Sequence, residues 1–347
     1  MGLGVAKDHP ATLQPARFYK KSMHGKTRSA TFHTSCKTDA GWFFPDDTTA
    51  VLIYNAPAMS NQKRAYIYAS AVVVFWSTIG SAFKIALAHT GVWELLLCSS
   101  IVATAVLLAY VALTGRLAAL SHFTLRDYRS SALLGLLNPL LYYALVIHAY
   151  DLLPAQQAST LNWIWPIVLV LLSIPVLKHK IGLRSVLAVV ISFFGVVIIG
   201  TRGRPLDWRF ESPLGVALAL SSAVVWALFW TYNTRDKRDE ATRLLLNFAF
   251  GSLYILAATL VLGRCTRINT GAILGGLYIG LFELGITFLL WLKALRLSET
   301  TARVANLVYI VPFLGLIVIR ITVGETIAPA TILGLAFIIT GILLQRK

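Results

Sequence analysis

Long apolar runs follow one another almost without interruption from Tyr66 to Gln345 of this 347-residue chain. Only 13% of the residues are charged and the mean hydropathy is +0.70, whereas a soluble globular domain carries roughly 25% charged residues. A helix needs about 20 mostly apolar residues to cross the roughly 30 Å of hydrocarbon in a bilayer. The sequence therefore predicts an all-α integral membrane protein with about ten transmembrane helices.

The apolar runs divide into two sets of five expected spans. The first set lies near Tyr66–Leu87, Val92–Thr114, Ser130–Tyr150, Ala155–Val176 and Leu183–Gly200. The second set lies near Pro213–Asn233, Arg243–Gly263, Thr270–Leu295, Thr300–Thr322 and Thr326–Gln345. This division predicts an N-terminal extension (1–58), a first five-helix repeat (59–200), an inter-repeat loop (201–212) and a second five-helix repeat (213–347).

The net charge of +16 is compatible with nucleic-acid binding in a soluble protein, but here the basic residues cluster between the apolar runs. With a cytoplasmic amino terminus, about 16 Lys and Arg residues fall on the cytoplasmic side and about 5 on the other, which follows the positive-inside bias of short loops. We therefore expect both termini in the cytoplasm, the lipid bilayer as a partner, and no nucleic acid. The Arg202–Arg209 loop is the one contrary signal.

Residues 1–58 show no helical or strand period and no apolar stretch of secretory-signal type. Three interpretations stay open: a disordered tail, an organelle transit peptide, or a start codon assigned too far upstream. Transit peptides are poor in acidic residues, so Asp39, Asp46 and Asp47 count against that interpretation. Met59-Ser-Asn-Gln-Lys-Arg64 is a short basic leader directly before the first span. Many bacterial multispan proteins begin in this way, so we expect a bacterial inner-membrane protein.

The two halves of the apolar region resemble each other. A shift of 146 residues places Leu161-Asn-Trp-Ile-Trp-Pro166 on Leu307-Val-Tyr-Ile-Val-Pro312 without a gap, and it pairs Gly195 with Gly341. Because five spans are an odd number, a second copy must be inserted upside down relative to the first. Inverted repeats place a binding site near the bilayer midplane, and rocking of the halves alternates access to it. The alternative is a chance likeness between apolar helices.

Short motifs recur in order along the chain. In the first half they are Phe75-Trp-Ser-Thr, Leu153-Pro-Ala-Gln, Leu161-Asn-Trp-Ile-Trp-Pro and Ser192-Phe-Phe-Gly-Val-Val. In the second half they are Val225-Trp-Ala-Leu, Lys293-Ala-Leu-Arg-Leu-Ser-Glu-Thr-Thr-Ala302, and Pro312 followed by Gly324-Glu-Thr-Ile. In their order, spacing and duplication these motifs resemble the drug/metabolite transporter superfamily, EamA type, from about Met59 to Lys347.

This resemblance implies ten helices in two inverted five-helix repeats, a central cavity, and export or exchange of metabolites. The motif Leu161-Asn-Trp-Ile-Trp-Pro is most similar to the YddG-like exporters of aromatic amino acids. The loop of the first half reads Lys178-His-Lys-Ile, without the acidic residue that the second half retains as Glu325. This departure leaves the solute open. The resemblance is also compatible with a homodimer.

Glu283 is the clearest candidate for a transport residue. It lies near the centre of the eighth expected span, and no Lys or Arg lies within one helical turn of it. An acidic residue at this depth costs on the order of 2.5–3.5 kcal/mol on insertion and is a functional candidate by default. It could bind a substrate ammonium or carry a coupling proton. The alternative is a structural, protonated carboxyl that is hydrogen-bonded to a neighbouring helix.

Asn162 and Asn306 each lie a few residues before a proline, Pro166 or Pro312, in the fourth and ninth expected spans. A proline frees the carbonyl four residues earlier, and freed backbone is tolerated where protein or a watery cavity covers it. We therefore interpret the prolines as helix breaks and the asparagines as candidate substrate-binding residues. Helix-to-helix hydrogen bonding, worth about 0.6 kcal/mol each, is the alternative.

Several aromatic residues lie too deep for an interfacial tryptophan belt and are candidates to line a solute cavity. Simple packing against lipid or other helices is equally compatible with any one of them. The candidates are Trp76, Trp163, Trp165 and Trp226. Tyr309 is a further candidate substrate-binding residue.

The sequence predicts a secondary transporter of a small organic solute, with amino acids as one candidate class. It contains no Gly-x4-Gly-Lys-Ser/Thr phosphate loop, and no nucleophile–base pair or metal-ligand cluster at membrane depth. Neither an ATP-driven pump nor an enzyme is therefore predicted, and no cofactor or metal is expected. Cys36, Cys98 and Cys265 match no metal or redox spacing. An intramembrane scaffold or a lipid-translocating protein stays open as the alternative.

Overall fold

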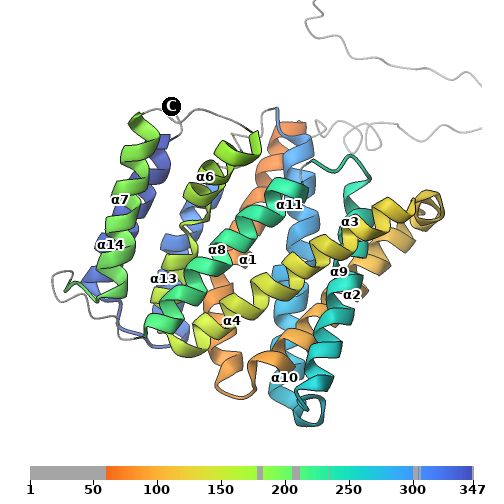
Figure 1. Cartoon of the computed structure of the whole chain (residues 1–347), viewed down its shortest axis with the longest axis horizontal. Coiled ribbons are helices and arrows are strands. Elements are labelled where there is room, and N and C mark those ends of the chain that lie inside the picture. Colours follow the sequence, from red (N-terminus) through yellow and green to blue (C-terminus); the bar gives the residue numbers. More distant parts are fainter. Residues whose placement is uncertain are drawn as a thin grey trace, which may run out of the picture. The chain divides into compact units, whose positions relative to one another are not determined.

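The computed structural model describes residues 60–177, 183–204, 212–233, 235–299, 304 and 306–345, and these ranges are helical or lie in turns between helices (Figure 1). The expected extension 1–58 and the loop Lys178-His-Lys-Ile lie outside them. The helices are α1 (Asn61–Leu87), α2 (Val92–Leu113), η1 (Leu117–His122), α3 (Leu125–Gly135), η2 (Leu136–Leu141), α4 (Tyr142–Leu152), α5 (Ala155–Asn162), α6 (Trp165–Leu177), α7 (Leu183–Gly200), α8 (Pro213–Asn233), α9 (Glu240–Val261), η3 (Cys265–Arg267), α10 (Thr270–Ile279), η4 (Gly280–Gly285), α11 (Ile286–Leu297), η5 (Asn306–Ile310), α13 (Val311–Thr322) and α14 (Pro329–Gln345).

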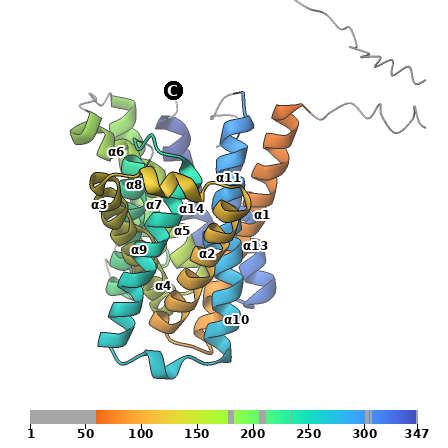
Figure 2. The same ribbon diagram turned by 90° about the vertical axis from the view of Figure 1, so that its right-hand side faces the viewer.

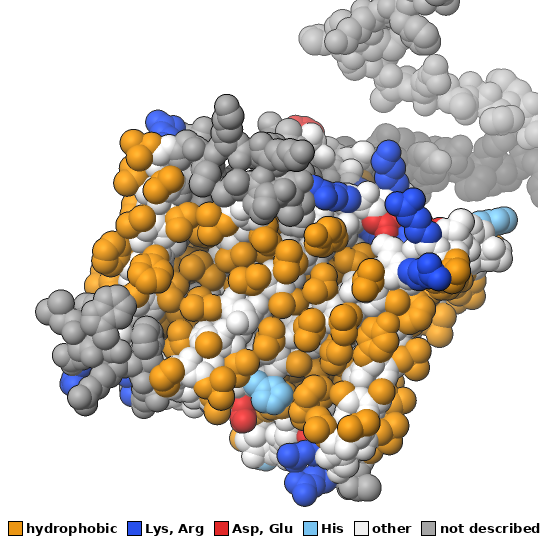
Figure 3. Space-filling view, in the orientation of Figure 1, with side chains coloured by type: hydrophobic (Ala, Val, Ile, Leu, Met, Phe, Trp, Pro, Cys, Tyr) orange, Lys and Arg blue, Asp and Glu red, His pale blue; other side chains and the backbone are white. Residues whose placement is uncertain are grey.

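Six helices of the described part are long and apolar enough to cross a membrane, counting Leu125–Leu152 and Thr270–Leu297 as one helix each. Shorter apolar helices cover Val186–Gly200, Leu307–Thr322 and Pro329–Leu344. Hydrophobic side chains cover much of the face in Figure 3, and Lys and Arg side chains gather toward its two ends. Exposed apolar side chains between polar ends are what a bilayer requires. The chain is a multi-pass membrane protein.

Polar side chains at the helix starts define several boundaries. Ser60, Thr124, Asp239 and Asn269 cap α1, α3, α9 and α10 by accepting hydrogen bonds from first-turn N–H groups. The start of α5 has no such residue of its own. Instead, the carboxylate of Glu325 in the second half accepts hydrogen bonds from its first two N–H groups, at 2.7 and 3.2 Å. The acidic residue retained in the second half therefore links the two halves.

Four of the predicted spans are interrupted: the fourth and ninth, where the sequence predicts breaks at Pro166 and Pro312, and the third and eighth, which the sequence predicts as continuous. The third changes from α3 through η2 to α4, and the eighth from α10 through η4 to α11, where η2 and η4 have π-helical hydrogen bonding. The fourth breaks between α5 and α6, and the ninth passes from η5 into α13. Pro139, Pro166 and Pro312 lie at or just after three of these interruptions, because proline lacks the N–H that a continuous helix needs.

Helices α7 and α14 lie side by side (Figure 1) and make reciprocal contacts. A Cβ added to Gly195 would lie 2.5 Å from the carbonyl oxygen of Gly334, and one added to Gly341 would lie 2.6 Å from that of Ala188. The 146-residue shift relates Gly195 to Gly341 and Ala188 to Gly334, so the two contacts are equivalent. Such mutual contacts are characteristic of two-fold symmetry. Residue numbers rise along one helix as they fall along the other, so the helices are antiparallel and the two-fold axis lies across them.

Other helix pairs repeat this reciprocity. Helix α1 packs against α11 and α13, and its counterpart α8 packs against α4 and α6. Helix α2 packs against α10, as α9 packs against α3. Helix α1 begins, and α14 ends, at the same end of the helical unit (Figure 2). This is the arrangement expected for two inverted copies with an even total of crossings.

Candidate functional site

A cavity of about 80 Å³ lies among helices from both halves. Its wall comes from α1, α4, α5, α6, α8, η4, η5 and α13. This volume holds several water molecules or one few-atom group. Most of the large side chains in the wall are aromatic: Trp76, Tyr142, Tyr150, Trp163, Trp165 and Trp226.

Glu283 lies in this wall and is only 6% exposed. The hydroxyl of Tyr143 donates a hydrogen bond to its Oε1 at 3.1 Å, while its Oε2 is buried without a hydrogen-bond partner. Among the described residues that line the cavity, Glu283 is the one charged side chain. A carboxyl in this position is half satisfied, because one of its two oxygens has no hydrogen-bond partner.

The π-helical segment η4 gives Glu283 its position. Gly280 and Gly285 bound the segment, and their small size lets it approach α2 closely. A Cβ on Gly280 would lie 2.7 Å from the carbonyl oxygen of Ser99. The hydroxyl of Thr287 donates to the carbonyl of Phe282 inside the irregular turn. Single π turns inside helices often occur at functional sites.

Helix α4 presents a row of side chains to the cavity. Tyr142, Val146 and Tyr150 follow at intervals of four residues and all line it, because residues four apart share one helix face. Tyr143 lies beside this row and reaches Glu283. Sequence reasoning missed these tyrosines. Their four-residue spacing was the available signal, but without the opposing helices it did not distinguish a cavity wall from an ordinary buried face.

Asn162 ends α5 and lines the cavity. Its Nδ2 donates to the hydroxyl of Ser222 at 2.8 Å, and its Oδ1 accepts from the hydroxyl of Tyr142 at 3.4 Å. The residue therefore combines both expected features: it bonds to other helices and it contributes to the cavity wall.

All four predicted tryptophans, Trp165 included, lie in the wall. Trp226 packs against Tyr142 with ring centroids 4.5 Å apart, and Trp163 follows directly after α5 at the helix interruption. The indole Nε1 of Trp76 is buried and has no hydrogen-bond partner. Trp76 and Glu283 thus bring an unpaired donor and an unpaired acceptor to one cavity.

The remaining candidates lie differently. Tyr309 packs against the core but is not among the residues that line the cavity. Asn306 begins η5, and its side chain lies outside the described part of the structure. Pro166 and Pro312 lie in the first turns of α6 and α13. In the described ranges no group of three or more His, Cys, Asp or Glu residues could hold a metal ion.

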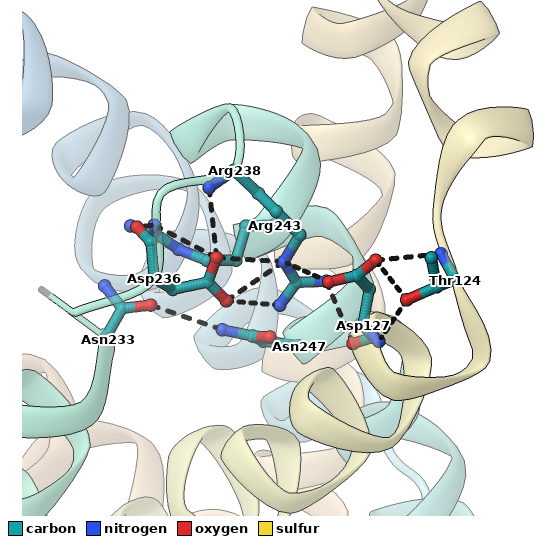
Figure 4. A network of polar contacts seen from close by, with 7 residues as sticks. All are labelled: Thr124, Asp127, Asn233, Asp236, Arg238, Arg243 and Asn247. Carbon is teal, nitrogen blue, oxygen red and sulfur yellow. Dashed lines mark hydrogen bonds and ion pairs between the residues drawn. The ribbon is translucent and has the colours of Figure 1, made fainter.

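A second polar cluster, which we name the loop network, joins the α8–α9 loop to α3 and α9 (Figure 4). Its members are Thr124, Asp127, Asn233, Asp236, Arg238, Arg243 and Asn247. Arg238 binds Asp236 through its Nε and a terminal nitrogen and donates to the carbonyl of Asp127 at 2.9 Å. Arg243 donates to the carbonyl of Asp236 and lies 3.9 Å from its carboxylate. None of these residues lines the cavity.

Comparison with known proteins identifies the family. The model of the EamA-like transporter family matches residues 63–201 and 213–345, once in each half. The chain belongs to the EamA-like transporter family. The family forms part of the drug/metabolite transporter superfamily, so this EamA-like protein is a transporter by membership.

Relatives of this EamA-like transporter carry the same general description. An "uncharacterized transporter" of Clostridium kluyveri is 25% identical over 80% of this chain and 92% of its own length. The "uncharacterized transporter YvbV" of Bacillus subtilis is 27% identical over 60% of this chain and 69% of its own. A solved crystal structure superposes with a TM-score of 0.58 at 18% identity, covering 81% of this chain and 96% of the other. That similarity concerns the fold alone.

Proposed function

We propose that this EamA-like transporter is a secondary transporter that moves a small organic metabolite by alternating access through the central cavity. One observation carries the proposal. Glu283 is buried in a cavity enclosed by both halves, and one of its carboxyl oxygens has no partner. An ionisable residue inside a membrane protein that faces a cavity marks a substrate or ion pathway by default.

Alternating access follows from the reciprocal packing of the two halves. In this proposal the interrupted spans form ten crossings in two inverted copies, and described helices of both halves contribute to the cavity wall. Because the contacts of one copy have counterparts in the other, exchanging the two sets of contacts would move the opening from one membrane face to the other. The breaks before Pro166 and Pro312 lie in the wall and act as hinges in this motion.

Glu283 is the proposed coupling residue. A charged carboxylate inside the membrane is costly, so a proton or a cationic solute group occupies it in turn. The groups that face it are Tyr143 through a hydrogen bond, with Tyr142 and Tyr150 in the same wall. Trp76, Trp163, Trp226 and Asn162 contact the solute in the cavity. Asn306 and Tyr309 also contact the solute when the two halves rearrange.

Amino acids are the first proposed class of solute. Export or exchange is the proposed direction of transport. We place the protein in a bacterial inner membrane with both termini cytoplasmic, since α1 begins and α14 ends at one end of the helical unit and basic residues favour the cytoplasmic side.

One observation favours the alternative function, lipid translocation. A mostly apolar pocket of about 450 Å³ lies between α1, α10 and α13, where Ile85, Leu274 and Val318 contribute to its wall. An acyl chain fits the apolar character of this pocket.

Counterflow in proteoliposomes tests the main proposal. Vesicles with purified protein are loaded with unlabelled amino acids, and uptake of the same labelled solutes is measured with and without an imposed pH gradient. Saturable counterflow that depends on the gradient is the expected result. Scrambling of a labelled lipid without counterflow of any amino acid or other soluble metabolite would replace the proposal by its alternative.

A further inference from the structure

We infer that the cavity recognises a protonated amine attached to an apolar, preferably aromatic body. The inference rests on the proposed function and sharpens it by naming the substrate class. It starts from the charges in the wall. Glu283 is the one charged lining residue in the described part of the chain, and no Lys, Arg or His lines the cavity there.

The free oxygen of Glu283 defines where an ammonium group would bind. Its Oε1 already accepts from Tyr143, while Oε2 is buried without a hydrogen-bond partner in a residue that lines the cavity. An ammonium has three donors and no acceptor, so one of its N–H groups can satisfy this oxygen. Charge-assisted bonds of this kind are roughly twice as strong as neutral ones. The bound pair is neutral overall, which lowers the cost of carrying it through the bilayer.

The aromatic wall favours the same ligand. Four tryptophans and two tyrosines line the cavity together with Glu283. A cation within about 6 Å of an indole or phenol face is attracted by the ring quadrupole, and aromatic cages recognise ammonium groups in this way. The faces that do not hold the cation offer apolar area to the body of the solute. The volume of about 80 Å³ accepts the head group, and the body extends as the halves separate.

Among the described lining residues, a carboxylate has no partner comparable to Glu283. The start of α6, which could offer helix N-terminal donors, is occupied: the N–H of Ile164 bonds to the carbonyl of Leu161, and the N–H groups of Ile167 and Val168 bond to the carbonyl of Ile164. Trp76 Nε1 is a single neutral donor. An anion would also lie in the same small cavity as Glu283, and like charges repel strongly where water is excluded.

The test is a matched set of four ligands that share a phenyl body: phenethylamine, phenylalaninamide, phenylalanine and 3-phenylpropionate. Binding to the purified full-length protein is measured by titration calorimetry, and flux of the same compounds is measured separately in proteoliposomes. We expect the two amines without a carboxylate to bind at least about tenfold more tightly than phenylalanine. The acid should show no saturable binding.

Variants tie the selectivity to the site. Glu283→Gln should abolish the preference for amines, and Glu283→Asp should restore part of it. Asp236→Asn, the same chemical change in the loop network, should leave the order of the four ligands unchanged. Thermal unfolding of each variant checks that it is folded.

The outcomes separate this inference from the transport proposal. Amine binding without flux supports the inference and contradicts transport of these compounds. Phenylalanine binding as tightly as its amide, saturable binding of the acid, or an unchanged preference in Glu283→Gln overturns the inference even if flux is observed. Absence of binding by all four also overturns it, and counterflow of another metabolite would then leave the transport proposal in place.

Discussion

Two acidic sites of this transporter with little solvent exposure differ in what surrounds them. In the loop network, Asp236 is held by Arg238 and lies beside Arg243, and the side chains of all three are 12% exposed or less. In the cavity, Glu283 has one tyrosine hydroxyl as its partner and a second oxygen without any. The same functional group is thus neutralised by the protein at one site and left to be neutralised by something else at the other.

This difference agrees with the proposal that one site is structural and the other functional. Buried charges that are paired and hydrogen-bonded hold elements together, and removing one partner is costly. A buried carboxyl without a cation lowers stability when it is ionised. In the proposed function, Glu283 is neutralised by a ligand or proton that it binds in part of the cycle. The predictions below test this contrast.

The largest expected effect is on transport by Glu283→Gln. Loss of the carboxylate removes the charge that binds the proton or ammonium, and loss of a buried charge partner costs about 2–5 kcal/mol. Gradient-driven flux in proteoliposomes should fall roughly 100-fold, while the temperature of unfolding stays within a few degrees of the original. Wild-type flux in this variant would remove Glu283 from its assigned role.

Asp236→Asn is the matched control. It makes the same change from carboxylate to amide in the loop network, and it should lower stability while gradient dependence of the remaining flux is retained. If Asp236→Asn abolished coupling and Glu283→Gln did not, the functional assignment of the two sites would be reversed.

The second prediction concerns stability. Arg238→Gln leaves the buried Asp236 without its closest cation, which should lower the free energy of unfolding by about 3 kcal/mol. Thermal unfolding in detergent measures the change. The control is Arg296→Gln, since Arg296 pairs with Glu240 at 2.9 Å but is 51% exposed. An exposed pair of this kind contributes about 1 kcal/mol or less. If the two variants lost equal amounts of unfolding free energy, burial would not strengthen the ion pairs of the loop network.

The third prediction is a pH dependence of stability. Burial alone would raise the pKa of Asp236, but hydrogen bonds from Arg238 and the charges of Arg238 and Arg243 outweigh it and hold the pKa below its usual value. The stabilisation is therefore fully present above the unfolded pKa of about 3.9. It is lost as the pH falls through the lower native pKa.

The loss of stabilisation should be visible as a smaller difference in unfolding temperature between two proteins. The unfolding temperatures of wild type and Asp236→Asn should differ most at pH 6 and approach each other toward pH 3, because protonation removes from the wild type what the substitution already removed. Other acidic groups, such as Asp239, titrate in both proteins and cancel in the comparison. A constant gap over this range would contradict the pKa direction.

The sequence predicted the membrane class, the family and the duplicated halves, because apolar run length and repeated motifs are local properties. The bounds of α8 were predicted without error, whereas the third and eighth spans were predicted as continuous and are not. In the fourth and ninth spans the sequence predicted breaks at Pro166 and Pro312, and the structure has α5 followed by α6 and η5 followed by α13 there. No proline in the sequence marks the π-helical segment that contains Glu283. Its irregular hydrogen bonding depends on close packing of Gly280 against α2, and that contact lies between residues far apart in the sequence.

The candidate site was predictable to a similar degree. Glu283, Asn162, Trp76, Trp163 and Trp226 were predicted from depth and residue type, and the structure places all five in one cavity wall. Their roles in transport stay predictions. The sequence also indicated Tyr309 as a candidate, although this residue is not in the wall. It did not indicate Tyr142, Tyr143 or Tyr150. Which side of a helix faces the cavity is decided by its neighbours, and the sequence does not state them.

The smallest expected effect comes from the aromatic wall. Trp76→Leu removes one ring from the cavity while keeping an apolar side chain, so an amine ligand loses one cation–π contact of about 1 kcal/mol. Its apparent affinity should fall roughly fivefold, whereas Trp76→Phe, which keeps a ring, should change it about twofold or less. Trp93→Leu is the control, because Trp93 packs against His148 and does not line the cavity. Equal effects of Trp76→Leu and Trp93→Leu on affinity would mean that the tryptophans stabilise the fold in general. The contrast between the two acidic sites would then rest on Glu283 alone.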